Sequence, residues 1–262
     1  MNTSPFPPQG VGSHAVTISR VADNQWHAIE NDLVAGRAHA SRRLDGRTFV
    51  SIDTWRDDIF DRLAAAMVAD RSELLHTVVD ENDRELLAGW ERAGFTMSRR
   101  EYEFVVPTEL SARSAPPDVV IAAADEGPLR LVDKAIRAEV EAAVGWHTMP
   151  AEVLPWQGGT RPMDPAKYTV AIRDGRYVGI VRVATRTRRP RIGLVAVLAA
   201  DRRHGIGRAL LTRVLQGLHR AGFEAVTAEV DESNTPALAL FESLGAQRTG
   251  TTLELSIHPG KA

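Results

Sequence analysis

The stretch DRRHGIGRALL, residues 201–211, holds two glycines separated by one isoleucine, and it leads into an apolar run with helical spacing. Backbone N–H groups at the start of a helix point at one spot, where the helix dipole favours an anion. Glycines let the backbone approach a ligand closely, and basic side chains add positive charge. The pattern suits a diphosphate, although a turn that only begins a helix gives the same sequence. The residues that would surround the phosphates are Arg202, Arg203, His204, Gly205, Ile206, Gly207 and Arg208.

Two other phosphate motifs are excluded at this point. No Lys-Ser or Lys-Thr pair follows the glycines, as it does in a Walker loop, and no ligand for a Mg²⁺ ion is offered. No third small residue completes the G-x-G-x-x-G fingerprint of dinucleotide-binding folds. A phosphate here would be held by backbone amides and basic side chains.

The elements that must position this segment are readable from hydrophobic periodicity and turn residues. Asp174-Gly175 predicts a hairpin turn, and Thr235-Pro236 predicts the start of a helix that Gly245 closes. The glycine segment then lies between a strand and a helix. The expected strands span 118–124, 168–173, 176–185, 191–198, 225–230 and 251–257. Three helices are expected: one at 127–145, one that begins near 207, and one from 235 to 245.

The chain also contains a repeat. A shift of 151 positions aligns VDENDRELLAGWERAGF (79–95) with VDESNTPALALFESLGA (230–246) without a gap. An acidic turn, a helical stripe and a terminal glycine keep one register, which favours two copies of one α/β unit over a chance likeness of amphipathic helices. In this register the glycine segment falls on SIDTWRDDIFD. The correspondences are Ser51 with Arg202, Thr54 with Gly205 and Arg56 with Gly207.

The first copy is expected to have lost its anion site. Asp57 and Asp58 stand at its helix start, where acidic side chains stabilise the helix and repel phosphate. The segment VPTELSARSAPPD is rich in Pro, Ser and Ala and is typical of a linker. We therefore expect a degenerate, structural domain at 14–107, a linker at 108–117 and an active domain at 118–258.

The composition argues against several classes of partner and site. The 262 residues carry a net charge of −2, which argues against a nucleic-acid partner. The absence of cysteine excludes disulfides, thiolate nucleophiles and Cys-type zinc sites. The polar N-terminus is not typical of a secretory signal, and no apolar run approaches the roughly 20 residues of a membrane helix. We expect a cytoplasmic protein with no metal and no membrane partner, as a monomer or homodimer.

Two motifs carry a family resemblance. Arg202-x-x-Gly205-x-Gly207, between a strand and a helix, resembles the acetyl-CoA signature R/Q-x-x-G-x-G/A of the GNAT N-acetyltransferase superfamily. NTPALALFESLG (234–245) resembles that family's N-x-x-A-x-x-L-Y-x-x-x-G helix, and the element order agrees over 118–257. The tandem arrangement resembles two-domain members such as the mycothiol synthases. The resemblance implies an α/β (α+β) fold of two GNAT-like acyl-CoA N-acyltransferase domains, each a mixed twisted sheet flanked by helices.

The resemblance also implies an activity, the transfer of an acetyl group from acetyl-CoA, a co-substrate, to a primary amine of a small molecule or peptide. Backbone amides of 203–208 would hold the pyrophosphate, backbone around Val195 and Val197 would pair with the pantetheine arm, and Asn234 would reach it. Direct attack by the amine needs a base and donors for the developing oxyanion. A non-catalytic acyl-CoA-binding sensor or scaffold is the alternative.

Two positions depart from the family pattern. Phe241, in the cofactor site, stands where many members have a tyrosine that serves as general acid, so that role is vacant or filled by water or another residue. Arg191 stands where some members have a carboxylate base. Glu229 matches the glutamate of ribosomal-protein N-terminal acetyltransferases and is the candidate base, with a solvated strand residue as the alternative. The first copy has Val78 at the equivalent place.

The acceptor site is less defined. Trp146, His147 and Trp156 lie in the irregular stretch that walls the acceptor pocket in this family, so they are candidate substrate contacts, with core packing of the two tryptophans as the alternative. The arginine-rich run 182–191 is a solvated turn or a contact for the CoA 3′-phosphate or an acidic acceptor. Amino acids, aminoglycosides, peptide N-termini and small thiol precursors all remain open as acceptors.

Overall fold

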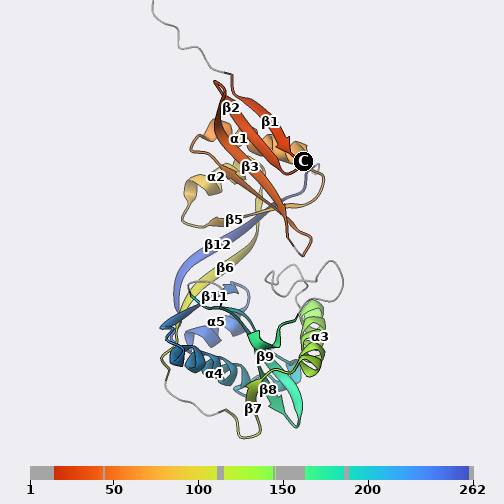
Figure 1. Ribbon diagram of the computed structural model, residues 1–262, viewed down its shortest axis with the longest axis vertical. Helices are drawn as coiled ribbons and strands as arrows, with labels where there is room; N and C mark the ends of the chain where they lie inside the picture. Colours follow the sequence, from red (N-terminus) through yellow and green to blue (C-terminus); the bar gives the residue numbers. More distant parts are fainter. Residues whose placement is uncertain are drawn as a thin grey trace, which may run out of the picture.

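The computed structural model describes residues 15–43, 45–110, 115–143, 145, 163–185 and 189–259. These residues form two α/β halves on one continuous sheet of twelve strands, with long strands crossing the middle of the molecule (Figure 1). The fold class expected from the sequence, a mixed sheet flanked by helices, is confirmed. Within the described ranges, no helix is long and apolar enough to cross a membrane.

The elements of the two halves follow the same order apart from one extra helix. The first half contains β1 (Thr17–Ala22), β2 (Gln25–Glu30), β3 (Leu33–Arg42), β4 (Thr48–Asp53), α1 (Asp57–Ala69), β5 (Leu75–Asp80), α2 (Arg84–Arg92) and β6 (Thr96–Pro107). The second contains β7 (Val120–Ala123), α3 (Glu126–Ala143), β8 (Tyr168–Arg173), β9 (Arg176–Ala184), β10 (Arg191–Val197), α4 (Ile206–Arg220), β11 (Ala225–Asp231), α5 (Thr235–Glu242) and β12 (Gln247–Ile257). Every element expected in the second half is present, although the last strand begins earlier than expected.

The halves exchange their last strands. The sheet order is β1-β2-β3-β4-β5-β12-β6-β11-β10-β9-β8-β7, which reads as two equivalent series that meet between β12 and β6. β12 pairs with β5 of the first half, and β6 pairs with β11 of the second. The sequence repeat did not reveal this exchange, because a repeat fixes the elements and not their partners. A cut in the expected linker, 108–117, would separate strands that are hydrogen-bonded to one another.

The exchange also joins the hydrophobic cores. Leu253 and Leu255 of β12 are buried in the core of the first half, under α1 and α2. Phe104 and Val106 of β6 are buried in the core of the second half, under α4 and α5. Burial of such side chains stabilises a fold by about 1.5–3 kcal/mol each. Each half therefore depends on a strand from the other.

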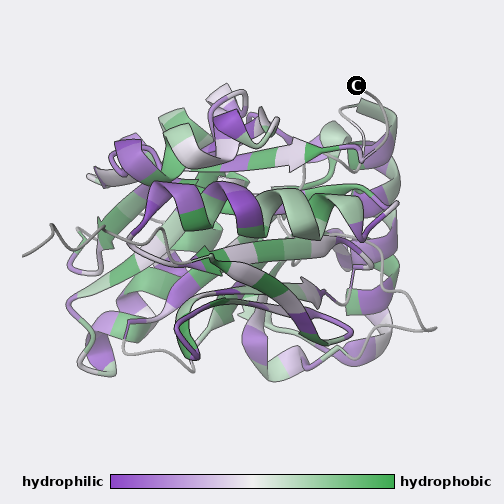
Figure 2. Ribbon diagram, turned by 90° about the horizontal axis from the view of Figure 1, so that it is seen from above, coloured by the Kyte–Doolittle hydropathy of each residue, from purple (hydrophilic) through white to green (hydrophobic). Residues whose placement is uncertain are grey.

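Helix α3 covers the other face of the second half. Leu129 and Ile136 pack against Tyr168, Val170 and Ile180, opposite the side that α4 covers. The helices are amphipathic, with hydrophobic and hydrophilic residues alternating along them (Figure 2). In the first half β1 leads directly into β2, so its described residues contain no equivalent of α3.

The parallel strand pairs in both halves are short. β4 pairs with β5 only at Thr48–Leu75 and Phe49–His76, and β10 pairs with β11 only at Arg191–Thr227 and Ile192–Ala228. β10 continues to Val197 while pairing only with β9. From Gly193 to Val197, the edge of β10 that faces β11 therefore makes no strand pairing with it. We call this separation of β10 from β11 the strand divergence, and it lies next to the start of α4.

One expected correspondence between the copies is wrong. Ser51 lies inside β4, whereas Arg202 lies in the connection between β10 and α4. This connection runs over three residues, 54–56, in the first half and over eight residues, 198–205, in the second. A gap-free register taken from the helices does not continue through such a length difference. The first copy therefore lacks most of the connection rather than carrying a substituted one.

Candidate functional site

The start of α4 has the geometry of an anion site. Gly205 caps the helix at φ 78°, and no side chain in the described chain caps the free amides of the first turn. A Cβ on Gly207 would lie 3.4 Å from Leu240 Cδ2, which is an ordinary van der Waals contact. Arg203 adopts a left-handed φ of 69°, and its side chain and that of His204 are exposed. These features fit a loop shaped to bring backbone N–H groups to a ligand.

Two of the arginines expected at the phosphates have partners within the protein. Arg202 Nε donates to the carbonyl oxygen of Val197 at 2.9 Å, and its Nη2 lies 3.1 Å from Glu139 Oε2. The same Glu139 oxygen accepts the N–H of Ala199 at 2.9 Å. Arg208 donates to the carbonyl oxygen of Ser243. Arg202 and Arg208 therefore brace the loop against α3 and α5, and phosphate contact by either of them stays a prediction.

The other expected cofactor contacts lie on β10 and on α5. Val195 and Val197 are half-buried on β10, with side chains against the core under α4. The Asn234 side chain accepts the N–H of Ala237 at 3.2 Å and thereby caps α5. Phe241 is 3% exposed and stacks on Phe104, with ring centroids 6.1 Å apart. The contacts of these residues with acetyl-CoA stay predictions.

Glu229 is brought together with Arg191. The Nε and Nη2 of Arg191 donate to the two carboxylate oxygens of Glu229 at 3.1 and 2.5 Å, across the β10–β11 pair. The Glu229 side chain is 37% exposed, so solvent or a ligand reaches it. The arginine that departs from the family pattern is therefore paired with the candidate base, beside the point where β10 and β11 separate.

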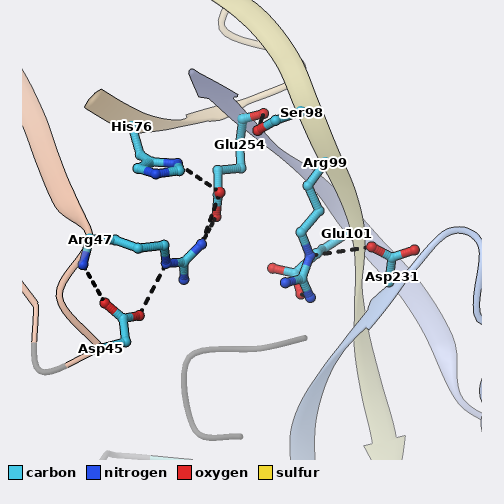
Figure 3. Close-up of polar contacts among 8 residues, drawn as sticks. All are labelled: Asp45, Arg47, His76, Ser98, Arg99, Glu101, Asp231 and Glu254. Carbon is cyan, nitrogen blue, oxygen red and sulfur yellow. Dashed lines mark hydrogen bonds and ion pairs between the residues drawn. The ribbon is translucent and has the colours of Figure 1, made fainter. Parts of the chain in front are cut away.

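A charged cluster lies next to this pair on the central strands (Figure 3). Arg99 donates to Glu101, and its Nε lies 3.3 Å from Asp231 Oδ2. On the first-half side, Glu254 accepts hydrogen bonds from Arg47 at 3.0 and 3.1 Å. His76 Nδ1 completes the cluster, 3.1 Å from Glu254 Oε1.

Sequence reasoning missed this cluster, because its members come from β5, β6, β11, β12 and the β3–β4 turn. The alternation of charged residues in RREYE (99–103) was the available signal. It indicates a strand with one polar face, but it does not reveal that the strand belongs to the sheet of the second copy.

Two carboxyl groups of the cluster have shifted pKa values in opposite directions. Burial raises the pKa of Glu101, and the negative charges of Glu229 and Glu254 add to this, against the opposing charge of Arg99. Burial also acts to raise the pKa of Glu254, but the His76 hydrogen bond and the charge of Arg47 outweigh it, so that pKa lies below its ordinary value. Glu254 is therefore held as an anion, and Glu101 takes a proton more readily than an ordinary glutamate.

Three expected acceptor residues cannot be placed. Trp146, His147 and Trp156 lie outside the described residues, between the end of α3 at Ala143 and the start of β8. The same holds for 186–188 in the arginine-rich run. Within the described part of the chain, no group of three or more metal-ligating side chains is gathered.

The comparison with known families agrees with this geometry. Residues 135–246 match the model of the acetyltransferase (GNAT) family. This segment contains α4 with its glycine start, the diverging strands and α5. The second half of the chain therefore contains an acetyltransferase domain of the GNAT family.

Two curated relatives are similar over part of the chain, both mycothiol acetyltransferases. That of Thermomonospora curvata is 43% identical over 88 residues, which is 32% of this chain and 29% of the relative. That of Thermobispora bispora is 39% identical over 92 residues, which is 32% of this chain and 31% of the relative. The match thus spans less than a third of either relative's length.

Solved structures share the fold of nearly the whole chain. A GCN5-related N-acetyltransferase from Sphaerobacter thermophilus aligns with a TM-score of 0.69 and 19% identity, over 91% of this chain and 82% of its own. A tandem GNAT protein from the clavulanic acid biosynthesis pathway aligns with a TM-score of 0.62 and 17% identity, over 91% and 83%. At these identities the likeness shows the fold, and it covers both halves of the chain.

Proposed function

We propose that the protein transfers an acetyl group from acetyl-CoA to a primary amine at the second copy, and that the first copy is structural. The observation that carries this proposal is the uncapped start of α4 behind a left-handed Gly205, beside the unpaired edge of β10. Backbone amides at a helix start suit a diphosphate, and a free strand edge suits the amides of a pantetheine arm. Acetyl-CoA supplies a thioester whose acyl carbon is open to attack by an amine.

The residues around this site have distinct tasks in the proposed reaction. The amine nitrogen forms a bond to the acyl carbon, the carbon–sulfur bond breaks, and the thiolate leaves with the bonding electrons. Glu229 takes the proton that the nitrogen loses, since its carboxylate is half-exposed beside the strand divergence. Arg191 holds both carboxylate oxygens and thereby fixes the direction of the side chain. A primary amine of a small molecule or peptide is the proposed acceptor.

Calorimetry with acetyl-CoA and a thiol-release screen over amino acids, amino sugars, peptides and aminothiols test the proposal. The protein has no cysteine, so it adds no thiol background with thiol-free amines; aminothiols are followed by acetylated product. We expect acetyl-CoA binding and turnover with at least one amine. Glu229→Gln should lower kcat about 100-fold or more while acetyl-CoA affinity is kept. Val78→Gln at the equivalent place in the first copy is the matched control and should leave kcat unchanged.

A non-catalytic acyl-CoA sensor is the second candidate function. It is favoured by Phe241, which has no hydroxyl and is buried against Phe104, and by the engagement of both Glu229 oxygens by Arg191. A sensor would bind acetyl-CoA in the calorimeter and acetylate no amine in the panel. Turnover with any amine would exclude it.

A further inference from the structure

Glu101 occupies a special place in the sheet. It belongs to β6 of the first copy, yet it lies directly opposite Asp231 of β11 on one side and Thr252 of β12 on the other. The repeat relates residue 101 to residue 252, so this pair lies where the two equivalent series of strands meet. The second copy therefore receives from the first a glutamate that its own sequence does not contain at that position.

The same face of the sheet carries Glu229. Glu229 is opposite Glu103 on β6, so Glu101 is its diagonal neighbour, at roughly 7–8 Å between Cα atoms. Side chains two residues apart on a strand point to the same face. The Glu101 side chain is 20% exposed, so it is buried in large part but not closed off from solvent.

The charged groups around Glu101 are those of Arg99 and Glu103 on its own strand, Asp231 and Glu229 on β11, Arg191 on β10 and Glu254 on β12. Arg99 contacts Glu101 and lies against Asp231, and Arg191 is bound to Glu229. The six groups other than Glu101 bring four negative and two positive charges. A further positive charge at this face would be attracted rather than repelled.

We propose that Glu101 is the second carboxylate of the acceptor site and binds the acceptor's ammonium group next to Glu229. This inference rests on the proposed acetyl transfer and adds that the acceptor enters as a cation. A protonated amine must lose two protons to become an amide. Glu101 takes the first and passes it to solvent, which frees the nitrogen lone pair. Glu229 takes the second as the carbon–nitrogen bond forms, and that proton accompanies the leaving thiolate or returns to solvent.

The energetics of Glu101 separate this role from a structural one. Burial and the neighbouring carboxylates raise its pKa, so the ionised form is less stable in the folded protein than in the unfolded chain. That cost is present above the folded pKa and disappears as the pH falls through it. A glutamate whose only role is to stabilise the fold would have a lowered pKa, and its ionised form would stabilise the folded protein. Glu101→Gln should therefore keep or raise the melting temperature at neutral pH.

The test uses the full chain with acetyl-CoA and the best amine from the panel, and it compares Glu101→Gln with Glu103→Gln. Glu103 lies two residues along the same strand, directly opposite Glu229, and is exposed, so its variant tests whether any carboxylate of this face serves or Glu101 in particular. We expect Glu101→Gln to raise the acceptor KM about tenfold or more, with acetyl-CoA affinity unchanged. In the wild type, part of the decrease of kcat/KM at acid pH should come from protonation of Glu101. That part of the decrease should be absent in Glu101→Gln. Glu101→Asp should recover part of the loss, and Glu103→Gln should match the wild type.

The outcomes are distinguishable. Equal KM values and equal pH profiles for the wild type and Glu101→Gln overturn this inference alone. A rise in KM that accompanies a lowered melting temperature, equally in Glu101→Gln and Glu103→Gln, would show a structural role and also overturn it. Acetylation of no amine by the wild type overturns the proposed function and this inference with it.

Discussion

The two copies differ most at the connection between the fourth strand and the following helix. In the second copy eight residues, 198–205, turn the chain and end at a left-handed glycine, while in the first copy three residues, 54–56, make the same connection. Asp57 and Asp58 then occupy the first turn of α1. The difference teaches that the proposed anion site depends on loop length as much as on residue type, because three residues leave no room for a curved backbone cradle.

The place where the two parallel strands separate, which we call the fork, also differs between the copies. In the first copy the Thr77 hydroxyl donates to the Val50 carbonyl oxygen at 3.0 Å, so a side chain takes up a backbone acceptor at the edge of β4. The equivalent residue in the second copy is Ala228, which has no hydroxyl. A side chain of the first copy thus satisfies one carbonyl oxygen at the strand edge, and Ala228 cannot make this bond in the second copy.

The copies nevertheless depend on each other. β6 lies inside the sheet of the second copy, and β12 lies inside that of the first. Removal of the first copy would take away β6, with Glu101, and open the other copy's sheet. This dependence gives a physical reason for keeping a copy whose connection is short.

Leu255→Ala should give the largest effect, because it tests that dependence. Leu255 is in β12 but is 1% exposed within the core of the first copy. The change should lower the free energy of unfolding by about 2–5 kcal/mol, and both copies should still unfold in one transition. Chemical denaturation followed by circular dichroism and tryptophan fluorescence measures this. Two separate transitions, with only one shifted, would show that the copies are independent.

Gly205→Glu should weaken acetyl-CoA binding about 100-fold, or about 2.8 kcal/mol. A side chain at φ 78° is strained, and a carboxylate at the start of α4 repels the phosphates. Trp55→Glu, at an 87% exposed position of the first copy's connection, is the control and should bind as the wild type does. Calorimetry gives both affinities. If Gly205→Glu bound normally, the loop assignment would be wrong.

Glu254→Gln should weaken the dependence of the free energy of unfolding on pH in the acid range. Because the folded pKa lies below the ordinary 4.5, ionised Glu254 stabilises the fold above about pH 4.5 and this contribution is lost as the pH falls through the folded pKa. Loss of the charge-assisted bonds from Arg47 and His76 should cost about 1.5 kcal/mol at neutral pH. Urea unfolding from pH 3 to pH 7 measures both; parallel curves for variant and wild type would contradict the assignment.

Thr77→Ala should give the smallest effect. It removes one buried hydrogen bond to Val50 and should cost about 1 kcal/mol, without creating a second acetyl-CoA site, because the first copy still lacks the loop. Denaturation and calorimetry on the same sample check the two statements. A second binding event in this variant would mean that the fork, and not the loop, decides which copy binds.

The sequence was informative where the signal is local. The hairpin at Asp174-Gly175, the helix between Thr235 and Gly245 and the helix that begins near Gly207 follow from residue type and spacing, and the structure has them. The exchange of β6 and β12 depends on long-range pairing, which no local pattern encodes. For the same reason Glu101 could not be connected to Glu229, since the two are 128 positions apart and meet only through the exchanged strand.

The number of acetyl-CoA molecules bound per chain tests the central contrast most directly. Titration calorimetry of the full chain should give one site, which Gly205→Glu weakens about 100-fold and Trp55→Glu leaves intact. Two sites would show that the first copy has kept its binding function in spite of its short, acidic connection. No binding at all would contradict the assignment of the α4 start as the seat of acetyl-CoA.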